Sequence, residues 1–113
     1  MTNVKEIKNV QQPKSIIWHY DIPIMDIVTV VLPIGSIIFD LMLHEGKIKL
    51  FVCCNEDNPP EEREIRILSD GMYFISETLD YIGSVTLLDG NLIYHVFEDL
   101  KEEEEHEQKE KEA

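Results

Sequence analysis

Short runs of β-branched and aromatic residues alternate with turn residues along positions 14–97 of this chain. Within residues 47–54, three aliphatic side chains (Ile48, Leu50 and Val52) occupy alternate positions, and a lysine lies on each side of the first of them. A period of two is typical of a strand with one buried face. Runs of this length at regular spacing, with turn residues between them, predict an all-β domain.

Eight strands are expected on this basis, and two of the connections read as hairpins. One hairpin turns at residues 44–46, and the other turns at residues 88–90. Residues 76–79 are expected to form one short helical turn, with Ser76 as its cap. The expected strands are residues 15–20, 27–32, 36–43, 47–54, 62–68, 72–75, 81–87 and 91–97.

Three of the expected strands carry informative face patterns. In residues 36–43, the alternation predicts that Ile37, Phe39, Leu41 and Leu43 share one apolar face. Two other strands, 27–32 and 91–97, are apolar on both faces. An isolated sheet needs only one apolar face, so a second sheet or another copy of the chain must cover the rest. We therefore expect a small antiparallel sandwich or a partly open barrel, assembled as a homo-oligomer.

Composition divides the chain into three parts. Residues 1–13 are polar and are expected to form a flexible leader, and residues 14–98 form the single β domain. Residues 99–113 carry mainly charge and are expected to be a disordered or helical acidic tail. Two Glu–Lys pairs in this tail have the i,i+4 spacing that supports a helix.

The charge balance limits the partners. The formal net charge is −13, of which the segment from residue 98 onward contributes −6 and the rest contributes −7. Both parts repel a polyanion, which argues against DNA or RNA as a partner. No apolar run is long enough to cross a bilayer or resembles a signal peptide, so a cytoplasmic protein is expected. The adjacent cysteines Cys53 and Cys54 point to opposite faces of a strand and suit a reducing compartment.

No catalytic template fits the sequence. A G-x-S-x-G turn, a phosphate-cradling glycine loop and the usual His spacings of zinc sites are all missing. Carboxylate pairs are frequent, but an acidic chain produces such pairs by chance. The expectation is a protein that is not an enzyme, with neither a metal nor a cofactor.

Five residues are candidates for ligand binding: Trp18, Arg63, Arg66, Tyr94 and His95. The two arginines lie on one expected strand and face opposite sides of it, with Arg63 on the apolar side. A guanidinium group on such a face can hold an anion or stack on a base.

Each candidate also has a structural interpretation. An ion pair between the arginines and Glu61, Glu64 or Glu45 would occupy their charge. A histidine between two apolar residues is commonly a hydrogen-bonded core residue, and Trp18 suits packing as well as stacking.

Several segments of the chain resemble a family of small bacteriophage proteins, an uncharacterised domain with a Pro-x-Gly turn and a closing His-Val-Phe-Glu signature. The resemblance covers about residues 15–98, and its most specific parts are residues 33–35 and 95–98. The chain departs from the family in three ways. Phe51 stands where a tryptophan is common, the turn at residues 69–71 reads Ser-Asp-Gly in place of Gly-Thr-Gly, and the chain has a long acidic tail. The segments that carry the resemblance are residues 17–20, 32–38, 49–52, 63–65, 69–71, 81–85 and 95–98.

The resemblance implies an accessory protein made inside an infected bacterium. By analogy with other small oligomeric β proteins of this class, it implies a sponge that sequesters a nucleotide-derived immune signal without cleaving it. In this hypothesis Trp18 and Tyr94 stack on the base, while Arg63, Arg66 and His95 contact phosphate. The alternative is a protein-interaction module that inhibits a host protein through the acidic tail or through a sheet edge.

Overall fold

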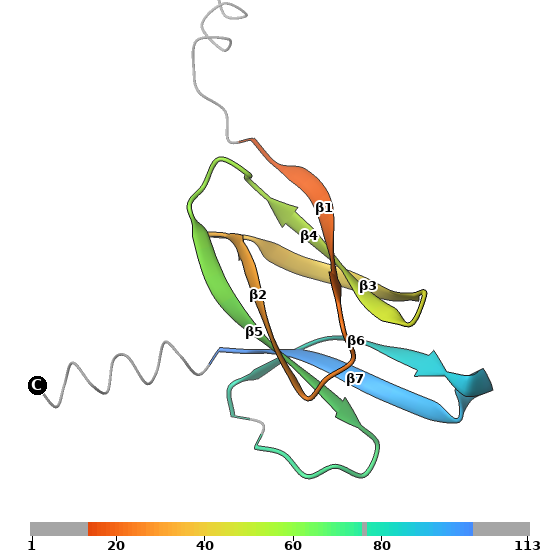
Figure 1. The fold of residues 1–113 in the computed structure, drawn as a ribbon. Helices are drawn as coiled ribbons and strands as arrows, with labels where there is room; N and C mark the ends of the chain where they lie inside the picture. Colours follow the sequence, from red (N-terminus) through yellow and green to blue (C-terminus); the bar gives the residue numbers. More distant parts are fainter. Residues whose placement is uncertain (1–13, 76, 101–113) are drawn as a thin grey trace, which may run out of the picture.

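A computed structural model describes residues 14–75 and 77–100 and contains two antiparallel sheets (Figure 1). The three-stranded sheet has the order β1-β4-β3, and the four-stranded sheet has the order β2-β5-β7-β6. The sheets meet where β3 lies against β6. The expected antiparallel β architecture is confirmed: two sheets share one core and do not close into a barrel. The strands are β1 (Ile16–Ile22), β2 (Ile27–Pro33), β3 (Ile37–His44), β4 (Lys47–Cys54), β5 (Pro60–Ser69), β6 (Leu79–Leu87) and β7 (Leu92–Asp99).

The core lies between the sheets and consists of aliphatic side chains from six strands. In β4 the alternation seen in the sequence is confirmed, because Ile48, Leu50 and Val52 are fully buried. Full burial of each such side chain contributes about 1.5–3 kcal/mol to folding. The other buried members of the core cluster are Ile22, Val30, Leu32, Cys54, Ile65, Ile67, Val85 and Val96.

The β3–β4 hairpin forms as expected. His44 pairs with Lys47, and the two residues between them both adopt positive φ, 51° for Glu45 and 79° for Gly46. Two consecutive positive φ angles match the type I′ turn, whose twist fits the two strands that it joins.

The face pattern expected for β3 is wrong in its first half. The pairing with β4 shifts between Ile38 and Asp40, which marks a β-bulge. A bulge inserts one residue and reverses the alternation. As a result Ile38 packs on the core, while Ile37 and Phe39 are exposed. Leu41 and Leu43 pack on the core as expected.

A second bulge brings the two sheets together. The β6–β7 pairing shifts between Tyr81 and Gly83, and a Cβ atom built on Gly83 would lie 3.3 Å from Cγ of Leu41 on β3. A side chain at this position would therefore press directly on the opposite sheet.

The expected strand at residues 72–75 is wrong, since these residues form no strand. The edges of β5 and β7 are occupied within the sheet, and residues 72–75 do not pair with the free edge of β6. Instead, Phe74 packs against Phe97 on the outer face of the four-stranded sheet, with ring centroids 5.9 Å apart.

Two other boundaries also differ. The expected helical turn at residues 76–79 is not formed in its described part, because Leu79 already begins β6, and Ser76 lies outside the described residues. A short 3-10 turn occurs at Leu88–Gly90 instead. Asp99, expected in the tail, is the buried last residue of β7. The leader and the rest of the tail lie outside the described residues.

Candidate functional site

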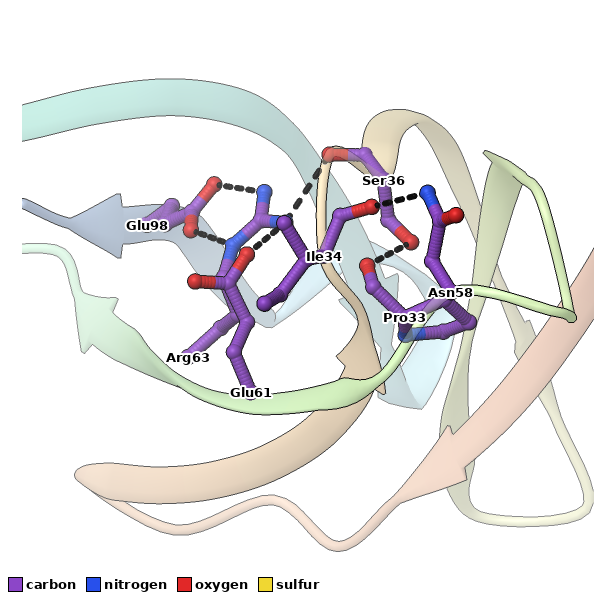
Figure 2. Close-up of polar contacts among 7 residues, drawn as sticks. All are labelled: Pro33, Ile34, Ser36, Asn58, Glu61, Arg63 and Glu98. Carbon is purple, nitrogen blue, oxygen red and sulfur yellow. Dashed lines mark hydrogen bonds and ion pairs between the residues drawn. The ribbon is translucent and has the colours of Figure 1, made fainter. Parts of the chain in front are cut away.

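Arg63 is held by a polar cluster inside the fold (Figure 2). Its side chain, on β5, faces the space between the sheets and donates two hydrogen bonds to the Glu98 carboxylate of β7. One bond joins Nη2 to Oε1 at 2.9 Å, and the other joins Nε to Oε2. Nη1 donates to the Ser36 carbonyl oxygen at 2.8 Å, and Glu61 lies 3.7 Å away.

This cluster joins three segments that are far apart in sequence. The two side chains are largely shielded, with 16% of Arg63 and 9% of Glu98 exposed. The bond to Glu98 raises the pKa of Arg63, against the opposing effect of burial. The Ser36 hydroxyl donates to the Pro33 carbonyl at 2.6 Å, so the same cluster fixes the crossover from β2 to β3. Each of the three side-chain nitrogens of Arg63 therefore donates one hydrogen bond within the fold.

The five candidate residues occupy three separate places. Arg63 and Tyr94 face the core side of the four-stranded sheet, where Tyr94 packs against the core cluster. Trp18 lies on β1, in the other sheet, and is 55% exposed. Arg66 and His95 share the outer face of the four-stranded sheet, on the adjacent strands β5 and β7. The fold of one chain thus brings together two of the five.

Arg66 lies in a row of apolar and aromatic residues across this outer face. The strand register places Ile27, Arg66, Phe97 and Tyr81 side by side on β2, β5, β7 and β6. The Tyr81 ring meets the Phe97 ring edge-on, with centroids 5.4 Å apart. Arg66 makes no ion pair within the described chain, and its Nε is buried without a hydrogen-bond partner. An unpaired guanidinium beside aromatic rings is suited to a charged group from outside the chain.

His95 occupies the neighbouring row and is held by a loop. Its Nε2 lies 2.6 Å from Oδ1 of Asp70, which belongs to the connection from β5 to β6. Between this connection and β7 there is a hollow of about 250 Å³. Its lining includes His95 and Phe97 of the sheet and Asp70, Met72 and Phe74 of the connection.

The same connection adds a strongly exposed apolar surface. Tyr73 is fully exposed and Ile75 is 78% exposed, and both lie beside the hollow along the chain. Ile27 and Val31 of β2 are about half exposed on the same sheet face. Exposed apolar side chains of this size commonly mark a binding or assembly site.

Asp70, Phe74 and Tyr81 were not among the sequence candidates. Their contacts with His95 and Phe97 depend on the path of the β5–β6 connection and on β5 lying next to β7. The one available signal was the run of aromatic and apolar residues at 72–75, whose composition predicted a strand.

Ser84 pairs with His95 in the strand register, but no hydrogen bond joins their side chains. A nucleophile and its base are therefore not in contact here. Within residues 14–75 and 77–100, no group of three or more His, Cys, Asp or Glu residues is placed to hold a metal ion. The same residues contain no helix with the length and apolar character needed to cross a membrane.

The fold and this face define a small antiparallel protein of two β-sheets, with an arginine beside Phe97 on the outer face that makes no ion pair within the described residues. Comparison with protein families identifies the chain further. The model of a domain of unknown function (DUF7352) matches residues 13–107, and the chain belongs to this family. No curated protein and no solved structure matches it.

Proposed function

We propose that this protein is a non-catalytic, homo-oligomeric binding protein that captures a small nucleotide-type ligand on the outer face of its four-stranded sheet. The observation that carries the proposal is the state of Arg66: its charge is unpaired within the described chain, its Nε is buried without a partner, and it lies beside Phe97 in a row that continues to Tyr81. Burying such a donor without a bond costs about 1–3 kcal/mol, which a bound anion would offset.

The arrangement of groups suits a phosphate and a base. A guanidinium group binds phosphate oxygens in a bidentate manner, and Arg66 supplies that group. The Phe74, Phe97 and Tyr81 rings offer flat surfaces on which a base can stack. The hollow of about 250 Å³ is somewhat smaller than a drug-sized pocket, so it suits one ring of a ligand rather than all of it.

Assembly completes the proposed site. Tyr73, Ile75 and Ile27 leave apolar surface around the hollow, and a second copy of the chain would cover this surface and enclose the ligand. In the setting that the phage resemblance implies, the ligand is a nucleotide-derived immune signal in the cytoplasm of an infected bacterium. The protein then acts as a sponge that withdraws the signal without cleaving it.

The test is a binding assay with a matched control. Purified protein is dialysed against cyclic nucleotides, cyclic dinucleotides and ADP-ribose derivatives, and bound ligand is released by heat and identified by mass spectrometry. Arg66→Gln is expected to weaken binding about tenfold or more, because a charge-assisted bond is lost. Lys47→Gln is the control, since Lys47 is the other basic residue of the described chain that makes no ion pair; binding should not change.

Three outcomes would contradict the proposal. They are no binding at micromolar ligand, equal binding by the Arg66→Gln variant, and recovery of a cleaved ligand. The alternative, an interaction module that acts through the acidic tail, is separated by deleting residues 101–113. The proposed sponge keeps its affinity after this deletion, whereas an interaction through the tail is lost.

A further inference from the structure

A second pocket lies at the edge of the three-stranded sheet, away from the Arg66 face. It has a volume of about 200 Å³, the room of roughly six or seven water molecules. Three alternate residues of β1 line it, Ile16, Trp18 and Tyr20, together with Cys54 at the end of β4 and Glu56 in the loop that follows. The four-stranded sheet leaves this end uncovered, since Trp18 is 55% exposed although it pairs with the buried Val52.

The charge of the pocket selects a cation. Glu56 is the one acidic or basic residue in its lining, and it makes no ion pair or hydrogen bond within the described part of the chain. Burial raises the pKa of Tyr20 and of Cys54, and the negative charge of Glu56 raises both further. Aromatic rings also attract cations, and two line this pocket: Tyr20 and Trp18, whose ring is stacked on His19 with centroids 5.4 Å apart. The pocket therefore combines apolar walls with one unpaired negative charge.

The pocket adjoins a strand edge that no other strand of the described sheets occupies. β1 has β4 as its single sheet neighbour, so one side of its backbone has no strand partner. An extended peptide can add to such an edge, with main-chain hydrogen bonds giving affinity and side-chain pockets giving specificity.

From these observations we infer that the edge of β1 binds an extended basic segment of a partner protein. The segment adds to the sheet as a strand and inserts an arginine side chain between Trp18 and Tyr20 toward the Glu56 carboxylate. This interaction is independent of the Arg66 face.

The single tryptophan of the chain makes the test direct, because its fluorescence reports on the pocket itself. The probe is a capped seven-residue peptide of alternating threonine and valine with one central arginine. We expect a saturable change in Trp18 fluorescence. A peptide with neutral citrulline in place of the arginine should bind about tenfold more weakly, because it lacks the charge-assisted bond. A peptide N-methylated at alternate amides should also bind more weakly, since it cannot pair with the edge.

Matched variants locate the interaction. Glu56→Gln is expected to weaken binding of the arginine peptide about tenfold and to remove its preference over the citrulline peptide. Glu45→Gln removes an acid at the opposite end of the same sheet and should leave binding unchanged, as should Arg66→Gln. Equal binding of the arginine and citrulline peptides, or of the Glu56→Gln and unaltered proteins, overturns the inference. The inference is also overturned if the Trp18 fluorescence spectrum changes when the protein alone is diluted. Such a change would mean that a second copy of the chain fills the pocket in the undiluted protein.

Discussion

The buried ion pair between Arg63 and Glu98 gives the sharpest prediction about stability. Replacing Glu98 by glutamine keeps the shape of the side chain but removes its charge and turns an amide donor toward the guanidinium. Breaking a buried pair by removing one partner costs about 3–5 kcal/mol. Arg63 keeps its bond to the Ser36 carbonyl and has Glu61 at 3.7 Å, so we expect a loss of about 2–4 kcal/mol.

Such a loss is a large part of the stability of a single domain, which is about 5–15 kcal/mol. For a domain of this size it lowers the Tm by roughly 10–25 °C. Urea unfolding followed by circular dichroism measures the free energy directly, and a thermal scan measures the Tm.

The double variant Arg63→Met with Glu98→Leu is the control that separates charge from packing. Replacing both partners of a buried pair by apolar residues is often neutral. Here the Ser36 carbonyl loses its donor, which costs about 1 kcal/mol. We therefore expect the double variant to be more stable than Glu98→Gln alone. The reasoning is refuted if Glu98→Gln costs less than about 1 kcal/mol, or if the double variant loses more than the single one.

Three further predictions concern other positions. Arg66→Met should raise the free energy of unfolding by about 1 kcal/mol, because it removes a buried donor that has no partner within the described residues. The same variant should abolish ligand binding. A clear loss of stability would give Arg66 a structural role instead. Iodoacetamide should modify Cys53 at least about tenfold faster than Cys54, because the Cys54 thiol is buried and has a raised pKa. Mass spectrometry of the Cys53→Ser and Cys54→Ser variants measures the two rates. Equal rates would contradict the burial of Cys54. Gly83→Val should lower the free energy of unfolding by about 1–3 kcal/mol, because the valine side chain would press on the opposite sheet. Urea unfolding measures this change. An unchanged unfolding midpoint would mean that the two sheets lie further apart.

Local pattern was enough to predict most of the strands. The alternation in β4 and the turn at Glu45–Gly46 both depend on neighbours in sequence, and both appear in the structure. The bulge in β3 escaped this reasoning because one inserted residue reverses the faces without changing the composition. Residues 72–75 have the composition of a strand, but they do not pair with the edge of β6 that the sheet order leaves free, and Phe74 packs on the face of the sheet instead.

The candidate site was predictable only in part, because local sequence patterns do not show which strands become neighbours. The opposite faces of Arg63 and Arg66 follow from alternation along one strand, and the structure confirms them. Glu98 as the partner of Arg63 depends on β5 lying next to β7, and these strands are separated in sequence by β6. Asp70 as the partner of His95 depends on how the β5–β6 connection lies over the sheet. Pairings of this kind come from topology and have no signature in the local sequence.

The contrast between Arg63 and Arg66 links the fold to the proposed function. Both are arginines of β5, three positions apart, and the pleat sends one inward and the other outward. The inward guanidinium finds a carboxylate and a carbonyl, so its charge stabilises the join between the sheets. The outward guanidinium lies beside Phe97 and makes no ion pair within the described residues, and its Nε is buried without a partner. Arg63 shows that an arginine on this strand can be fully paired within the fold, whereas the buried, unpaired Nε of Arg66 costs stability. Such a cost is common at binding sites, where a partner from outside supplies the missing contact. The proposed binding function therefore belongs to the outer face, and the inner face holds the Arg63–Glu98 pair that supports the fold.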